Sequence, residues 1–494
     1  MMGTTVTESN GARRYSLHWL AMSRLAFALS VLMLGACEQA SPTVADAPTT
    51  AQAADGQYIS WKEHLIDDQA TSGVELRGGD GLQIADLDQD GFDDVVSVHE
   101  DNHHIRIAFG SADPDEWVLV SLAEGDEAIA AEDVSIADAN GDGWLDVVAA
   151  CELAHLIYFQ NPGDAATIRS GDWPRTIPRG TQGRGSWIRV FFADLDGDGR
   201  PEVTAPNKGD QLPAGGGRPE SFEVKEISWF ALPEDPLEGD QWEEHVLYRV
   251  QIPMNARPVD LDKDGDLDLF SGSRFEMRPF WFENQGGSPP EFAYHPIDVA
   301  GRNEPQPDQF AGKWLTSMNV VFEDLNHDGR LDVILQETPL IVSWLEQPES
   351  FEQPWTIHKI GDLGPDTSTG LTLVDINGDG RKDLFTGGYS ADPRDHDGEE
   401  ITVNSRTGRL AWWAQPEDPA AEWTLYNVSR RKRGMYDQFV AKDMDGDGDV
   451  DFITTRGNSG EFDGLLWLEQ VRTDEAAAAF EPARESESAH LPMP

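Results

Sequence analysis

Short hydrophobic stretches alternate along the chain with acidic turns that contain glycine. One stretch, Leu371–Val374, leads into such a turn, and a second, Leu384–Thr386, leaves it. A third carries Trp shortly before Pro, as in Ser343–Pro348, and a fourth begins with Trp, as in Trp355–Ile360. Runs of this length between turn residues are typical of β-strands. Each period therefore predicts four short strands, which we name A to D in chain order.

The acidic turn occurs seven times, always as the nine-residue element Asp-x-Asp/Asn-x-Asp-Gly-x-x-Asp/Glu. Four short strands in each of seven periods predict an all-β fold, a seven-bladed β-propeller with four-stranded blades. Several independent β-domains are the alternative, but one four-stranded sheet cannot bury both of its faces. The seven turns start at Asp86, Asp138, Asp194, Asp260, Asp324, Asp375 and Asp443.

The order of the strands also predicts how the ring closes. The repeats begin with a D strand, Trp61–Ile66, and end with a C strand, Leu465–Gln470. We therefore expect the N-terminal strand to join the last blade, which closes the ring without a free sheet edge. The propeller is expected to span residues 58–471.

The turns and the Trp-containing strands resemble the FG-GAP/VCBS repeat family, which is also seen in the propellers of integrin α-chains. The resemblance covers nearly all of the chain after its N-terminal segment. It implies a β-propeller, and it implies a binding function, because FG-GAP repeats are found mostly in interaction proteins.

The turns also have the spacing of a calcium loop, with side-chain oxygens at positions 1, 3, 5 and 9, a backbone carbonyl at 7 and Gly at 6. Strands flank the loop and no Glu stands at position 12, so it is not an EF-hand. Such clusters repel themselves without a cation, although an acidic turn without metal is the alternative. We expect up to seven structural Ca²⁺ ions, held by Asp86, Asp88, Asp90, Asp94, Asp138, Asn140, Asp142, Asp146, Asp194, Asp196, Asp198, Glu202, Asp260, Asp262, Asp264, Asp268, Asp324, Asn326, Asp328, Asp332, Asp375, Asn377, Asp379, Asp383, Asp443, Asp445, Asp447 and Asp451.

The N-terminus has the features of an export signal. Arg24 precedes the apolar run Leu25–Leu34, which is too short to span a bilayer, and small residues follow it. Leu34–Cys37 resembles the lipobox of bacterial lipoproteins, in which the Cys is lipidated; an ordinary signal peptide is the alternative. Either Met1 or Met22 is compatible with this signal as the start.

These features divide the chain into four parts. We expect a signal peptide over residues 1–36, a flexible tether over 37–57, the propeller over 58–471 and a disordered tail over 472–494. Lipidation of Cys37 would place the protein in the bacterial cell envelope, on the periplasmic side or the surface of the outer membrane. The lipid is then its only contact with the membrane, and we expect a monomer.

The amino-acid composition limits the classes of partner that the protein can bind. The 494 residues carry a formal net charge of −53. This charge excludes nucleic acid as a main partner, because phosphate binding needs a basic surface. Hydrophobic residues at 39% are enough to build a sizeable core. The two cysteines, Cys37 and Cys151, do not make a disulfide framework.

The loops opposite the acidic turns are long and non-repeating, and function tends to reside on such loops. Histidine there is suited to a general base or, with Glu100 or Glu152, to a second metal site. Arginine is suited to an anionic ligand; the alternative is a structural network with Glu132, Glu152, Glu276 and Glu337. His64, His245, His295 and His358 recur at one position of strand D and are expected to be structural. The candidate site residues are His99, His103, His155, Arg189, Arg257, Arg274 and Tyr436.

Three functions remain open from the sequence. The first is binding of a glycan or an envelope protein, and the second is an assembly scaffold. The third is a carbohydrate-active enzyme. Lyase-like β-elimination on a uronate or sulfated sugar needs a base, an Arg and an acid, and the candidate residues include these types. Propellers of similar make occur in rhamnogalacturonan lyases and ulvan lyases, but no residue here matches a lyase motif. The fold favours binding, and whether the protein is an enzyme stays open.

Overall fold

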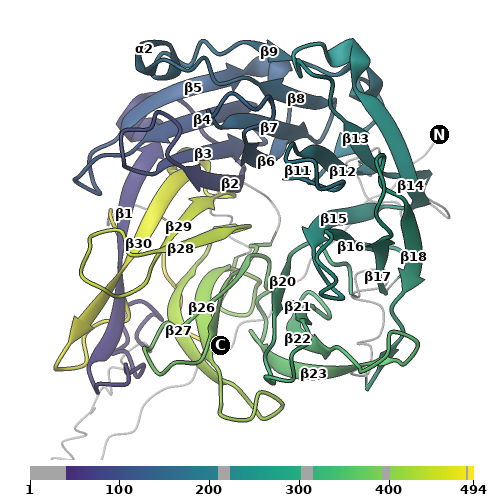
Figure 1. The fold of residues 1–494 in the computed structure, drawn as a ribbon. Helices are drawn as coiled ribbons and strands as arrows, with labels where there is room; N and C mark the ends of the chain where they lie inside the picture. The colour runs from purple at the N-terminus through teal and green to yellow at the C-terminus, as the bar shows by residue number, and fades with distance from the viewer. Residues whose placement is uncertain (1–40, 210–222, 277, 302–314, 392–400, 485–487) are drawn as a thin grey trace, which may run out of the picture. The chain divides into compact units, whose positions relative to one another are not determined.

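The predicted strands form seven antiparallel sheets that lie around a ring in the computed structural model, as the blades of a β-propeller (Figure 1). The structure describes residues 41–209, 223–276, 278–301, 315–391, 401–484 and 488–494. The predicted signal peptide and Cys37 lie outside these residues. Each blade orders its strands A-B-C-D, and the A strands of neighbouring blades contact each other at the inside of the ring. The prediction of an all-β, seven-bladed propeller is confirmed.

The first three blades follow the chain order. Blade 1 contains β2 (Gly79–Ala85), β3 (Asp94–His99), β4 (His104–Phe109) and β5 (Val118–Glu124). Blade 2 contains β6 (Ala131–Ala137), β7 (Asp146–Cys151), β8 (Leu156–Phe159) and β9 (Arg175–Thr176). Blade 3 divides its A strand into β10 (Ser186–Trp187) and β11 (Phe191–Ala193), followed by β12 (Glu202–Gly209), β13 (Val224–Ala231) and β14 (Glu243–Gln251).

The next three blades repeat the arrangement. Blade 4 contains β15 (Pro253–Val259), β16 (Asp268–Ser273), β17 (Pro279–Asn284) and β18 (Phe292–Pro296). Blade 5 contains β20 (Val320–Glu323), β21 (Asp332–Gln336), β22 (Ile341–Glu346) and β23 (Trp355–Asp362), with β19 (Val299–Ala300) added parallel to β23. Blade 6 contains β24 (Leu371–Val374), β25 (Asp383–Gly387), β26 (Gly408–Ala414) and β27 (Thr424–Arg431).

Blade 7 joins the two ends of the chain. Its A, B and C strands are β28 (Phe439–Lys442), β29 (Asp451–Arg456) and β30 (Gly464–Thr473). Its D strand is β1 (Tyr58–Asp68), which pairs antiparallel with β30 so that Trp61 lies opposite Gln470. The N-terminal strand therefore closes the ring, as predicted.

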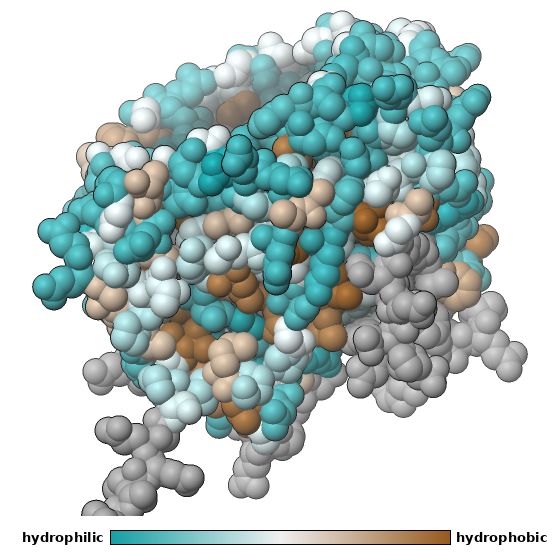
Figure 2. Space-filling model, turned by 90° about the horizontal axis from the view of Figure 1, so that it is seen from below, coloured by the Kyte–Doolittle hydropathy of each residue, from teal (hydrophilic) through white to brown (hydrophobic). Residues whose placement is uncertain are grey.

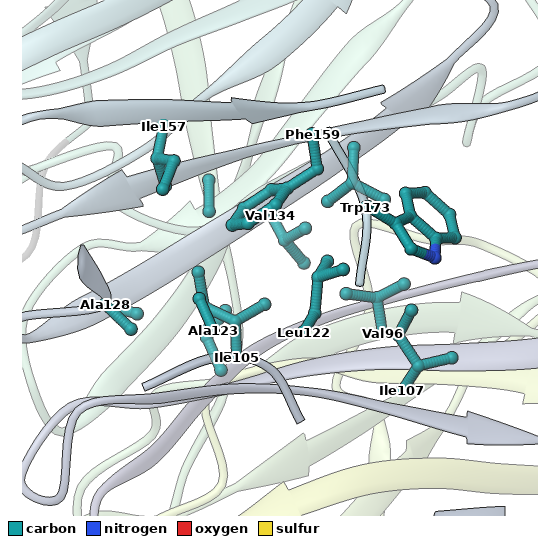
Figure 3. Packing of buried hydrophobic residues seen from close by; sticks show 14 of the residues in the cluster. Val96, Ile105, Ile107, Leu122, Ala123, Ala128, Val134, Ile157, Phe159 and Trp173 are labelled. Atoms are coloured by element: carbon teal, nitrogen blue, oxygen red, sulfur yellow. The ribbon is translucent and has the colours of Figure 1, made fainter. Parts of the chain in front are cut away.

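Hydrophobic side chains fill the space between neighbouring blades. Figure 3 shows Val96 and Ile107 of blade 1 in one cluster with Val134 and Phe159 of blade 2. Successive residues of one strand pack against different neighbouring blades, because their side chains point to opposite faces of the sheet. Val147 belongs to the cluster with blade 1, whereas Val148 belongs to the cluster with blade 3. The core is therefore divided among the junctions between blades.

The terminal segments differ from the expectation of a flexible tether and a disordered tail. Strand β31 (Phe480–Glu481) pairs parallel with β1, and Pro48 forms a bridge with Ala478. Ala45, Ala51 and Phe480 are buried in the same cluster as Trp61. The small side chains of the Ala-rich segment let its backbone approach the blade closely, so residues 42–57 and 473–484 are packed against the ring.

The described residues contain two short α-helices, α1 (Gln69–Ser72) and α2 (Ala165–Ile168). Single 3₁₀ turns lie at Gly125–Glu127, Arg179–Thr181, Gly239–Gln241 and Gly460–Phe462. Asp68 and Asp164 cap the two α-helices by accepting backbone N–H bonds. Within the described ranges, none of the helices has the length and hydrophobicity that crossing a bilayer requires.

The repeated histidines of strand D stack on the tryptophans of strand C. The ring centroids of His245 and Trp229 are 3.9 Å apart, and those of His64 and Trp467 are 4.0 Å apart. The equivalent pairs in blades 4 and 5 are His295 with Trp281 and His358 with Trp344. The predicted structural role of these four histidines is confirmed.

Candidate functional site

Each acidic loop joins strand A to strand B and is held together by its own carboxylates. In loop 1, the backbone N–H groups of Asp90 and Gly91 donate to the carboxylate of Asp86, each over 3.0 Å. The glycine at position 6 has a positive φ in all seven loops, 95° at Gly91 and 103° at Gly265. Glycine adopts this conformation without steric cost, which explains its presence there. The predicted tight turn is therefore present in every blade.

In six of the seven loops the last carboxylate is buried and accepts a backbone N–H bond near the end of strand C of its own blade, or just after it. Asp332 accepts a 3.0 Å bond from Leu325 N–H at position 2 of the loop and another 3.0 Å bond from Gln347 N–H after strand C. Burial raises the pKa of Asp332 to about 7, with a smaller contribution from the charge of Asp328. Burial likewise raises the pKa of Asp94, Asp268, Asp383 and Asp451 to about 7.

An amide side chain near the end of strand C, or just after it, connects each of four blades to the loop of the preceding blade. Asn161 of blade 2 donates to the carbonyl oxygen of Leu87 in loop 1 over 2.9 Å. Gln347 of blade 5 donates to Leu261 in loop 4, and Gln470 of blade 7 donates to Ile376 in loop 6. Asn284 of blade 4 makes the same bond to Leu195 in loop 3. Sequence reasoning missed these amides, although an Asn or Gln near the end of strand C is visible in the repeat.

The donor set of the loops fits a calcium ion. Four loops bring three carboxylate oxygens within 4.8 Å of one another: Asp86, Asp88 and Asp90; Asp194, Asp196 and Glu202; Asp260, Asp262 and Asp268; and Asp443, Asp445 and Asp451. Oxygen ligands at these positions are those that Ca²⁺ prefers. The other three loops carry an amide at position 3, at Asn140, Asn326 and Asn377.

The candidate histidines of the opposite face do not surround one cavity. His99 is fully buried at the end of β3, and burial lowers its pKa to about 3. His103 Nδ1 lies 2.9 Å from both the carbonyl oxygen of Glu100 and the backbone nitrogen of Ala130. His155 Nε2 lies 3.0 Å from the carbonyl oxygen of Glu127. All three take part in the packing or the backbone contacts of blades 1 and 2.

Arg189 lies inside the ring and is paired. Its guanidinium donates to Asp437 of blade 7 over 2.6 Å and to Asn319 of blade 5 over 2.9 Å. Arg257 of β15 lies over the ring of Phe191, with 5.7 Å between the guanidinium carbon and the ring centroid. Each of these two candidates therefore contacts a side chain of another blade.

The other predicted residues have different surroundings. Tyr436 is fully buried in the hydrophobic cluster of blades 6 and 7. Arg274 is half-buried after β16; burial lowers its pKa, and the charge of Glu132 acts in the opposite direction. Lys208 of β12 forms an ion pair with the buried Glu152 of blade 2. The alternative of a structural ion-pair network is correct for Glu152.

Other arginines of this face pair with acids that were not predicted. Arg184 contacts Glu244 over 2.5 Å and Glu226 over 3.3 Å. Arg278 contacts Asp298 over 3.3 Å, and Arg456 contacts the buried Glu63 over 3.2 Å. Acidic residues of the same blade or of a neighbouring blade therefore neutralise Arg184, Arg278, Arg456 and Lys208.

One charged cluster does converge at the inner rim. Carboxylate oxygens of Asp80, Glu100 and Glu132 lie within 4.8 Å of one another, where the A strands of blades 1 and 2 begin. Burial and the charge of Glu100 raise the pKa of Glu132. Burial and the charge of Arg274 lower the pKa of Lys208. Sequence reasoning missed Asp80; its signal was its place at the start of an A strand, where Arg189 and Asp437 also lie.

These features define a repeat propeller with one acidic loop in every blade. The chain belongs to the FG-GAP-like repeat family, whose model matches residues 86–149, 138–205, 260–335 and 324–386. The matched segments begin at loops 1, 2, 4 and 5. A comparison with curated proteins gives no match.

Proposed function

We propose that this chain is a secreted, lipid-anchored, calcium-binding propeller that binds a glycan or an envelope protein on the face opposite the acidic loops. One observation carries the choice of binding over catalysis. The residues best suited to proton transfer, His99, His103 and Tyr436, are occupied in packing or backbone contacts. A general base must reach the proton it removes, and these groups face the interior of blades or blade junctions.

Calcium is proposed as a structural ligand of the loops. Side-chain oxygens at positions 1, 3, 5 and 9, which are carboxylates except for the amides of Asn140, Asn326 and Asn377, would hold it together with the carbonyl oxygen of position 7. The fit rests on the close carboxylate oxygens of four loops. The ion would supply the positive charge that offsets their mutual repulsion and would fix strand A to strand B.

The binding surface is proposed at the inner rim. Asp80, Glu100 and Glu132 lie there beside the charges of Lys208 and Arg274. Charges of both signs on a rigid framework suit a polar ligand, because specificity comes from a few well-placed polar groups. The side of the molecule in Figure 2 is mostly hydrophilic, with hydrophobic residues in separate small patches. At the inner rim, which this view does not show, the charged groups of Asp80, Glu132 and Arg274 fit a polar ligand better than an extended apolar one.

The test uses the full chain with Cys37→Ser, which removes the lipid acceptor, in calcium-containing buffer. Neutral, uronate-containing and sulfated polysaccharides and an envelope protein extract are offered, while ultraviolet absorbance reports new double bonds. We expect retention of one ligand class without any product. Arg274→Ala should weaken this retention, whereas Lys359→Ala, which removes an exposed ion pair with Asp362, should leave it unchanged.

Two results would contradict the proposal. New absorbance together with shorter polymer would make the protein a lyase. Retention that is equal for Arg274→Ala and Lys359→Ala would move the ligand away from the inner rim. The anchor has its own readout, because Cys37→Ser should transfer the protein from the membrane fraction to the soluble fraction.

A further inference from the structure

An arginine of blade 2 reaches into the acidic loop of blade 1. Nε of Arg169 donates to Oδ2 of Asp88 over 2.5 Å, and Nη2 donates to Oδ2 of Asp90 over 2.6 Å. Asp88 and Asp90 are positions 3 and 5 of loop 1, two of the residues that would bind calcium there. A guanidinium that binds two carboxylates at once makes strong, charge-assisted hydrogen bonds.

The surrounding structure fixes this arginine in place. Arg169 follows α2, and its backbone N–H donates to Ala165 over 3.0 Å. Ile168, next to it, is fully buried in the cluster between blades 1 and 2. The guanidinium carbon lies 5.4 Å from the ring centroid of Phe109 in blade 1. The helix, the core contact and the aromatic ring therefore hold the guanidinium at the loop before any ligand binds.

Among the loops with Asp at position 3, loop 1 differs from the others because an arginine of another blade pairs with this Asp. In loop 3, Asp196 accepts a 2.7 Å bond from the neutral hydroxyl of Ser288 in blade 4. Among the described residues, Asp262 of loop 4 and Asp445 of loop 7 have no ion pair with a Lys or Arg. The side chain of Asp88 is 1% exposed, whereas Asp445 is exposed. Arg169 therefore supplies both positive charge and burial at loop 1.

Loops 5 and 6 also contain an arginine, but its contact is of another kind. Arg330 and Arg381 stand at position 7 of their own loops and reach one carboxylate each, at Asp328 and Asp379. Such a contact joins residues of a single turn. Arg169 joins two carboxylates of one blade to the backbone of another blade.

We propose that the guanidinium of Arg169 is the resident cation of loop 1 and competes with calcium for Asp88 and Asp90. It replaces the metal in offsetting the repulsion of the loop carboxylates and fastens blade 2 to blade 1. Loop 1 then keeps its structure without calcium, whereas loop 4 depends on it. The inference deepens the proposed function, on which its competition with calcium rests.

The test is hydrogen exchange of the full Cys37→Ser chain, followed in peptides that contain loop 1 or loop 4, with calcium or with EDTA. In the parent protein, EDTA should speed exchange in loop 4 and leave loop 1 unchanged. In Arg169→Gln, EDTA should speed exchange in loop 1 about tenfold, because charged hydrogen bonds are lost. Calcium should restore its protection. Arg278→Gln, whose ion pair with Asp298 lies outside the loops, is the matched control.

The outcomes separate this inference from the calcium proposal. If loops 1 and 4 of the parent protein respond equally to EDTA, Arg169 is not a substitute for the metal, although the loops still bind calcium. If hydrogen exchange in loop 4 is the same with EDTA and with calcium, the calcium proposal fails. Arg169→Gln then still tests the role of the guanidinium, through its effect on hydrogen exchange in loop 1. Native mass spectrometry should count one more bound calcium in Arg169→Gln than in the parent, and an equal count would overturn the competition.

Discussion

Arg189 and Asp437 form an ion pair between two blades that are not neighbours. Arg189 lies between β10 and β11, the two parts of the A strand of blade 3, and Asp437 precedes the A strand of blade 7. The guanidinium nitrogen and the carboxylate oxygen are 2.6 Å apart. Their side chains are 2% and 3% exposed. Asn319, before the A strand of blade 5, accepts from the same nitrogen. One guanidinium therefore connects three blades at the inside of the ring.

Removing Arg189 should destabilise the whole propeller. Arg189→Ala leaves the buried carboxylate of Asp437 without its cation, and breaking a buried pair from one side costs about 3–5 kcal/mol. We expect this loss in the free energy of unfolding, measured by urea denaturation. Arg278→Ala breaks an exposed pair and should cost at most about 1 kcal/mol.

A double variant distinguishes burial of charge from loss of packing. Arg189→Met with Asp437→Leu removes both charges and keeps much of the volume, so it should recover most of the stability lost in Arg189→Ala. If the double variant is as unstable as the single one, the pair is not the source of the effect.

Chelation should lower the stability of the chain through its acidic loops. A ligand present at one hundred times its dissociation constant stabilises the folded state by about 2.7 kcal/mol. EDTA should therefore lower the melting temperature, and Asp262→Asn in loop 4 should raise the calcium concentration needed to restore it. Asp240→Asn, an exposed carboxylate outside the loops, is the control. A melting temperature that is the same with EDTA and with calcium would rule out structural calcium.

Calcium affinity should rise with pH. Burial, together with the charges of Asp262 and Asp264, raises the pKa of Asp268 to about 7 in the metal-free protein. Below this pH the carboxyl holds a proton that calcium must displace, and above it the carboxylate is free to bind. Titration calorimetry should show tighter binding at pH 8 than at pH 6, with proton release near pH 7 that depends on the buffer. Equal affinities at both pH values would contradict this.

The repeat explains why so much of the fold was predictable and why its cross-blade contacts were not. Strand order, blade count and closure by Trp61–Ile66 follow from periodic positions, since each period must bury the same hydrophobic faces. The bond from Arg169 to Asp88 depends on the path of one non-repeating connection. The terminal segments were misjudged because Ala and Pro are typical of disordered chains, whereas here Ala45 and Ala51 lie in a buried cluster.

His99 should make the protein less stable in mild acid. Burial, with the nearby charge of Arg106, lowers its pKa from 6.5 to about 3, so the folded state keeps it neutral while the unfolded chain takes up a proton. Stability therefore falls as pH drops from about 6.5 toward 3, by up to about 1.4 kcal/mol per pH unit. His99→Gln should flatten this part of the pH profile, and His327→Gln, exposed in loop 5, should not. Parallel profiles for the parent and His99→Gln would exclude this role.

Phe480 should contribute to stability although it lies in a segment with the composition of a disordered tail. It is 3% exposed, pairs opposite Trp61 and lies 5.3 Å from the guanidinium carbon of Arg431. Truncating a buried Phe to Ala costs about 3–5 kcal/mol because it leaves a cavity. Phe480→Ala should show this loss in urea unfolding. Met493→Ala, 38% exposed near the C-terminus, should change the free energy of unfolding by less than about 0.5 kcal/mol. If both variants unfold like the parent, the C-terminal segment is not packed against blade 7 in solution, and β1 keeps an open edge there.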